Sequence, residues 1–224
     1  MRIIWLDGQS RVYAITAAQT SVRLYGAADD QRGTREIVVA YTLLGVEHIL
    51  TGFDHLLFVL GLLFLVGFNR RLVLTITAFT LAHSVTLAAS ALEWVFLRQA
   101  PVEAVIALSI VLVVTESLKS RETLARRWPA LVAFVFGLVH GLGFAGALKE
   151  IGLPQNNLTV ALLTFNLGVE FGQLAAVAVA LGITLLLRRQ RWFLAARTPV
   201  LYGCGTLASY WSLLRIAAML GWSV

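Results

Sequence analysis

Long apolar runs, separated by short polar clusters, dominate the chain after residue 36. They cover roughly residues 37–67, 72–95, 102–118, 129–149, 158–187 and 199–221. One helix needs about 20 predominantly apolar residues to cross the hydrocarbon core of a bilayer. The pattern therefore predicts an all-α polytopic membrane protein with about six transmembrane helices.

The first apolar run is longer than one simple span. Gly45 and Gly52 are candidate break points within it, and an interfacial helix followed by a span is one interpretation. Residues 1–35 contain no comparable apolar run but show partial alternation with β-branched residues. This segment is predicted to be a strand-like extracytoplasmic tail or the remnant of a β-domain, and residues 36–224 the transmembrane helical domain.

Composition supports a membrane protein over a soluble helical domain. Hydrophobic residues make up 58% of the 224 residues and charged residues only 13%, whereas soluble domains average about 45–50% and about 25%. The net charge of +6 comes from short Arg and Lys clusters between the apolar runs. Such placement fixes membrane orientation and argues against a nucleic-acid partner. The single cysteine, Cys204, excludes an intrachain disulfide and a cysteine metal cluster.

The basic residues are distributed unevenly between the two sets of connections. Ten basic residues follow the first, third and fifth runs: Arg70, Arg71, Lys119, Arg121, Arg126, Arg127, Arg188, Arg189, Arg191 and Arg197. Only two, Arg98 and Lys149, follow the second and fourth runs. The positive-inside rule places the richer side in the cytoplasm and both termini outside. The five arginines of residues 1–35 oppose this orientation unless the tail is a folded domain.

All four histidines, His48, His55, His83 and His140, lie inside predicted spans and none in a loop. Ionisable groups at membrane depth are costly and are usually retained for a partner, a cavity or an ion. His48, Gly52 and His55 follow the i, i+4, i+7 spacing of one helical face. Asp54 points about 100° away from His55 on a regular helix. It could bind the metal directly if the helix breaks near Gly52, or it could orient one of the ligands.

Other polar residues accompany the histidines. His83 lies between Thr80 and Thr86 beside Ser84, and His140 lies among the glycines of "FGLVHGLGFAG". Asn166, Glu170 and Gln173 form a polar stripe at helical spacing that is predicted to line a pathway. Arg215 in the last run is expected to pair with an acid or to extend toward the membrane surface.

This set of donors predicts a metal site. Imidazole and carboxylate ligands suit Zn, Ni, Co, Cu or Fe, and no thiolate accompanies them. The predicted ligands are His48, Asp54, His55, His83 and His140. The structural alternative, in which the histidines only hydrogen-bond neighbouring helices, stays open at this point.

The segments "GVEHILTGFDHLLFVLGLLFL", "TITAFTLAHSVTLAAS", "PVEAVIALSIVLVVTESL", "FVFGLVHGLGFAGALKEIGL" and "LLTFNLGVEFGQL" resemble, in order, the HupE/UreJ family of bacterial membrane proteins. The pattern from His48 to Asp54-His55 carries most of the specificity. The resemblance implies a nickel permease of the bacterial cytoplasmic membrane, with His48, Asp54, His55 and His140 as metal-recognition residues. The resemblance is strongest with the branch of the family that carries an extracytoplasmic β-domain. It implies that residues 1–35 are the end of a truncated domain of this kind.

Two functions follow as hypotheses. The first is a permease for Ni²⁺ or a similar divalent ion, with the bilayer and the metal ion as partners. The second is an intramembrane zinc hydrolase acting on a lipid or a membrane peptide, in which Glu47 or Glu170 is the general base and Ser84 positions the substrate. The absence of an acidic residue soon after His140 favours the second. The sequence does not decide whether the protein forms a homo-oligomer.

Overall fold

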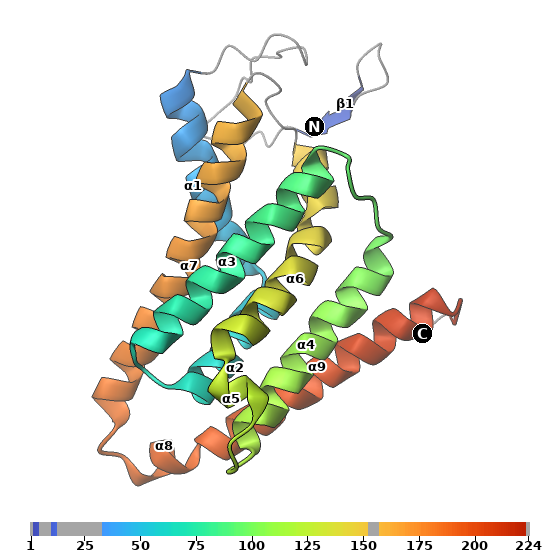
Figure 1. Cartoon of the computed structure of the whole chain (residues 1–224). Coiled ribbons are helices and arrows are strands. Elements are labelled where there is room, and N and C mark those ends of the chain that lie inside the picture. The colour runs from blue at the N-terminus through green and yellow to red at the C-terminus, as the bar shows by residue number, and fades with distance from the viewer. Residues whose placement is uncertain (1, 5–9, 13–32, 152–156, 223–224) are drawn as a thin grey trace.

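The computed structural model describes residues 2–4, 10–12, 33–151 and 157–222, which are almost entirely helical (Figure 1). The prediction of an all-α polytopic membrane protein is confirmed. Each predicted apolar run forms one helix, except that the first forms two, and two short helices lie in the connections. The helices are α1 (Thr34–Thr51), α2 (Phe53–Val66), α3 (Arg70–Ala91), α4 (Gln99–Leu118), α5 (Leu124–Arg127), α6 (Pro129–Ile151), α7 (Leu158–Leu187), α8 (Arg191–Ala195) and α9 (Arg197–Met219).

Two short strands precede the helices. β1 (Arg2–Ile4) and β2 (Ser10–Val12) pair antiparallel, with Ile3 opposite Arg11. Most of the strand-like stretch predicted after residue 12 lies outside the described residues. The division into a tail of residues 1–35 and a helical domain of residues 36–224 stays a prediction.

Three described helices, α3, α4 and α7, are long and apolar enough to cross a membrane. α1 and α2 meet at an angle of 74° and count as a fourth span if they form one broken crossing. The apolar part of α6, Pro129–Phe144, is shorter than a membrane span, and α9 is not apolar enough to be counted as one. The count of six spans stays a prediction, because three of the described helices, or four with the bent pair, have the length and hydropathy of a membrane span.

The helices pack mainly as neighbouring pairs, α1 with α7, α3 with α6 and α4 with α9, and α2 lies against α4 (Figure 1). Two apolar clusters fill the interior. One includes Phe58, Ile76 and Phe79, and the other includes Ile49 and Phe165. The aromatic rings of both clusters contact the histidines, so the candidate site lies where the two clusters meet.

Glycine decides how closely α1 and α7 approach. A Cβ built on Gly45 would lie 2.1 Å from the carbonyl oxygen of Phe165, and one built on Gly168 would lie 2.1 Å from the carbonyl oxygen of Thr42. Small residues let membrane helices pack backbone to backbone. The prediction of a break at Gly45 is therefore wrong, because this glycine lies within α1 as a packing contact. The predicted break at Gly52 is confirmed.

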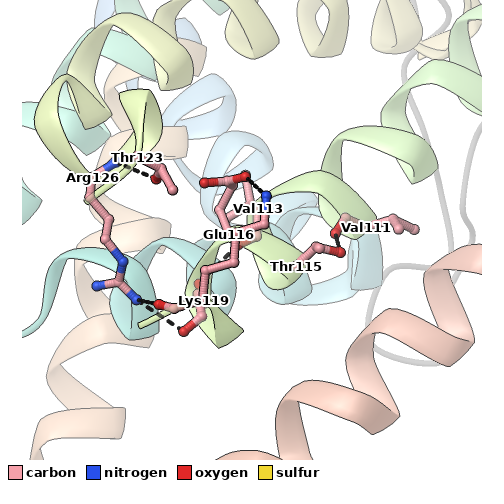
Figure 2. A network of polar contacts seen from close by, with 8 residues as sticks. Val111, Val113, Thr115, Glu116, Lys119, Thr123 and Arg126 are labelled. Carbon is pink, nitrogen blue, oxygen red and sulfur yellow. Dashed lines mark hydrogen bonds and ion pairs between the residues drawn. The ribbon is translucent and has the colours of Figure 1, made fainter. Parts of the chain in front are cut away.

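The three basic connections, after α2, α4 and α7, lie at the same end of the bundle (Figure 1). Arg126 donates there to the carbonyl oxygens of Lys119 at 2.9 Å and Ser117 at 3.1 Å (Figure 2). Arg197 donates to the same Ser117 oxygen at 2.8 Å. These carbonyls belong to the last turn of α4 and its C-terminal flank, where helices leave acceptors without intrahelical partners. The arginines thus cap a helix as well as marking one side of the bundle.

Candidate metal centre

Three histidines from three helices converge at the break between α1 and α2. His48 lies in the last turn of α1, His55 in the first turn of α2, and His83 in α3. Each offers one ligand atom, and these three atoms lie within 4.8 Å of one another. Bonded Zn–N distances are about 2.0–2.1 Å, so one ion between the three nitrogens needs only small side-chain movements.

The break itself depends on Gly52. A Cβ at this position would lie 2.6 Å from the carbonyl oxygen of His48 and 3.0 Å from Nδ1 of His55. Its φ of −81° is open to any residue, so the requirement is for space and not for an unusual backbone conformation. A side chain here would push apart the two histidines, whose rings are 4.6 Å apart.

Four of the six ring nitrogens of this group are buried without a hydrogen-bond partner in the described part of the chain. Among the residues that the structure describes, none pairs with Nε2 of His48, Nε2 of His55 or either nitrogen of His83. A buried polar atom without a partner costs about 1–3 kcal/mol. A transition metal would use these lone pairs, and neutral imidazole is the donor that Zn, Ni, Co and Cu favour. The donors present therefore fit such an ion.

His140 on α6 lies beside this group. Its ring centroid is 5.2 Å from that of His55, and its side chain is 1% exposed. Its Nε2 lies 3.1 Å from Oγ of Ser109 on α4, and its Nδ1 has no hydrogen-bond partner among the described residues. The structure thus brings three of the five predicted ligands together and places the fourth histidine next to them.

Asp54, the fifth predicted ligand, is not part of the histidine group. Its Oδ2 lies 3.3 Å from Nη2 of Arg215 on α9, and Nε of Arg215 lies 3.2 Å from Oε2 of Glu103 on α4. Adjacent residues on a helix point about 100° apart, so His55 faces the interior while Asp54 faces α4 and α9. The expectation that Arg215 pairs with an acid is confirmed. The structure gives Asp54 an ion-pair partner in place of the predicted position at the metal.

The polar stripe of α7 faces α3. Thr77 donates to Oε1 of Glu170 at 2.6 Å, and Thr80 donates to Oε1 of Gln173 at 3.1 Å. Asn166 donates to the carbonyl oxygen of Leu162 within its own helix. Glu170 and Gln173 are thus bonded to α3 within about two turns of His83. A pathway along these residues stays a proposal.

The candidate catalytic residues are not members of the three-histidine group. Ser84 donates to the carbonyl oxygen of Thr80 at 2.7 Å. Glu47 is exposed on α1, and Glu170 accepts from Thr77. Among the described residues, the group that could hold a metal ion contains only histidines.

Sequence reasoning missed two neighbours of the histidines. Phe144 lies against His48 with ring centroids 3.9 Å apart and stacks on Phe165. Ser109, which contacts His140, was not predicted as a site residue because it is an isolated serine in an apolar run. The sequence did contain an indication that Ser109 faces the interior. Val102, Ile106 and Ser109 follow helical spacing and share the buried face of α4.

The fold and the site define a class: an α-helical membrane protein with a buried histidine group able to hold a metal ion. A family model described as HupE / UreJ protein matches residues 26–215 of the chain. The protein belongs to the HupE/UreJ family, as the motifs predicted. Searches of the curated proteins and of the solved structures found no match.

Proposed function

We propose that this protein is a permease for a divalent transition metal, Ni²⁺ or a similar ion. The observation that carries the proposal is the convergence of His48, His55 and His83, from three helices, at a break in the membrane domain. Transporters commonly bind substrate at discontinuous helices, where helix ends and unwound backbone can contact an ion. The C-terminal end of α1 also carries partial negative charge, which favours a cation.

Ligand chemistry narrows the substrate class. Imidazole nitrogen favours Zn, Ni, Co and Cu, whereas Mg and Ca prefer oxygen ligands. The cysteine, Cys204, packs in the apolar cluster around α9 and is not part of the histidine group. A thiolate is therefore not one of the ligands of this proposed site. Ni²⁺ and Zn²⁺ are both compatible with these donors.

The proposal includes a path and an orientation. Asn166, Glu170 and Gln173 would line the approach along α7, next to the α3 turn that leads to His83. The basic end of the bundle would face the cytoplasm of a bacterial cell and both termini the outside. The sequence contains no nucleotide-binding motif, so transport would be passive or driven by a gradient.

The hydrolase alternative needs a general base and a substrate-positioning group close to the metal. Glu47 is exposed, Ser84 bonds to the backbone of its own helix, and Glu170 is engaged by Thr77. The absence of an acidic residue soon after His140 is the sequence feature that favours a hydrolase. The contacts of these three residues in the described part of the chain add nothing in its favour.

The test combines binding and transport. Purified protein in nanodiscs would be titrated with Ni²⁺, Co²⁺ and Zn²⁺ by calorimetry, and proteoliposomes would be assayed for uptake of the same ions. His48→Ala and His83→Ala should abolish both signals. Thr115→Val is the control, because Thr115 is exposed on α4 and its hydroxyl donates to the carbonyl oxygen of Val111 in the same helix. Binding without uptake would contradict a permease, and absence of binding would contradict the metal site itself.

A further inference from the structure

Ser109 makes two contacts with one hydroxyl proton. Its Oγ lies 2.6 Å from the carbonyl oxygen of Ile106 and 3.1 Å from Nε2 of His140. A hydroxyl can donate only one hydrogen bond but can accept two. The shorter contact is typical of O–H···O and the longer of N–H···O. Serine also commonly donates to a carbonyl one turn earlier in its own helix.

These distances favour one tautomer of neutral His140. Because the hydroxyl proton goes to Ile106, the Ser109 oxygen accepts from His140, and the hydrogen of the neutral imidazole lies on Nε2. The other nitrogen, Nδ1, then carries the lone pair. This is the atom that is buried without a hydrogen-bond partner among the described residues. A neutral histidine bonded to a metal through one nitrogen usually donates the other N–H to a partner that fixes its tautomer.

We propose that Ser109 is a positioning residue that holds His140 in the Nε2–H tautomer, so that Nδ1 acts as a fourth nitrogen ligand of the site. This inference rests on the proposed metal-binding function of the histidine group. Four neutral nitrogens make a ligand set for a four-coordinate divalent ion such as Zn²⁺ or Co²⁺, or for Ni²⁺ with added water. Ser109 thereby contributes to the affinity of the site for such ions.

Packing supports a fixed ring. The rings of Phe58 and Phe79 both lie 5.0 Å from that of His140, centroid to centroid, and enclose it. Gly141, the next residue on α6, lies so close to α3 that a Cβ would meet the carbonyl oxygen of His83 at 2.3 Å. α6 is therefore held against the helix that carries His83.

The first test measures the tautomer in the metal-free protein. ¹⁵N spectra of histidine-labelled protein in nanodiscs should show hydrogen on Nε2 of His140 and none on Nδ1. A His140→Gln sample identifies the signal by its loss. A metal-free protein with hydrogen on Nδ1 of His140 would overturn the proposal. Because this measurement involves no metal, it tests the predicted tautomer even if the protein transports nothing.

The second test measures affinity and its coupling. Ser109→Ala should weaken Zn²⁺ and Co²⁺ binding about 10–100-fold, the usual effect of losing a residue that orients a ligand. Ser109→Thr, which keeps the hydroxyl, should restore binding. Ser212→Ala is the matched control, because Ser212 is a buried serine of α9 that bonds to the α4 backbone at Ala104. Unchanged affinity in Ser109→Ala would contradict the proposal.

A double-mutant cycle separates this role from a general structural one. If Ser109 acts through His140, Ser109→Ala should have no further effect on affinity in a His140→Ala background. An equal loss in both backgrounds would show that Ser109 only supports the fold and would overturn the proposal. Wild-type protein that binds no metal would instead contradict the proposed function, while the tautomer measurement would still decide the hydrogen bond.

Discussion

The carboxylate of Asp54 lies 3.3 Å from the guanidinium of Arg215, whereas the next residue, His55, belongs to the buried histidine group. Neighbouring residues of α2 thus have separate roles. His55 faces the proposed metal site, and Asp54 ties the start of α2 to α9 and, through Arg215, to Glu103 on α4. The ion pair therefore anchors the start of α2 on a different side from the histidine group.

We expect Asp54→Asn to lower stability more than metal affinity. Arg215 would lose one of its two carboxylate partners, and residues in direct contact usually show coupling energies of about 0.5–3 kcal/mol. A cycle of Asp54→Asn and Arg215→Gln, followed by thermal unfolding in nanodiscs, measures this energy. A loss of Ni²⁺ affinity in Asp54→Asn as large as in His48→Ala would instead show that Asp54 is a metal ligand.

A divalent metal ion that binds the site should stabilise the folded protein, and more so as its concentration exceeds its dissociation constant. A ligand that binds only the native state adds about 2.7 kcal/mol at a concentration of 100 times its dissociation constant. Thermal unfolding with increasing Ni²⁺ or Zn²⁺ should therefore shift to higher temperature, and Mg²⁺ should have no effect. His55→Ala should lose the shift. A shift of the same size with Mg²⁺, or in His55→Ala, would mean that the ions act elsewhere.

Gly45→Ala should destabilise the contact between α1 and α7. The added methyl group would overlap the backbone carbonyl of Phe165, and overpacking of this kind typically costs about 1–3 kcal/mol. Gly182→Ala in α7 is the matched control, because a Cβ there meets nothing within 4 Å. The control should be neutral or gain about 0.5–1 kcal/mol from the helix preference of alanine. Equal stability of the two variants would contradict the close packing.

Arg126→Ala should remove a helix cap at the basic end. The carbonyl oxygens of Ser117 and Lys119 would lose a charged donor, and hydrogen bonds to charged groups contribute about 1.5–3 kcal/mol. Arg127→Ala removes the same charge from an exposed position and should leave the unfolding temperature nearly unchanged. If both variants unfold at the same lower temperature, net charge rather than capping explains the effect.

Labelling of single cysteines should place the basic end in the cytoplasm. In a Cys204→Ala background, a membrane-impermeant maleimide added to intact cells should label Trp94→Cys and leave Glu122→Cys and Gln190→Cys unlabelled. All three native residues are exposed in the structure. The reverse labelling pattern would invert the orientation. Labelling of Glu122→Cys alone would show that the basic connections lie on different sides.

The sequence by itself determined the helices and the chemistry that they carry. Hydropathy is a local property, so the apolar runs predicted the bounds of α3, α4, α6, α7 and α9 to within a few residues. The restriction of every histidine to an apolar run already indicated a buried site, because isolated polar groups are costly there. Gly52 was correctly predicted as a break point of the first run, but the single helical face predicted for His48 and His55 was wrong, because the break places them on α1 and α2.

Only the tertiary structure decided which side chains meet. Convergence of His48, His55 and His83 depends on how each helix is rotated about its axis, and that rotation follows from contacts between distant segments, such as Gly45 with α7. The same contacts place Gly45 inside a helix, turn Asp54 toward Arg215 and bring Ser109 to His140. Spacing along one helix specifies a shared face, but the partner of that face is set by packing across the bundle.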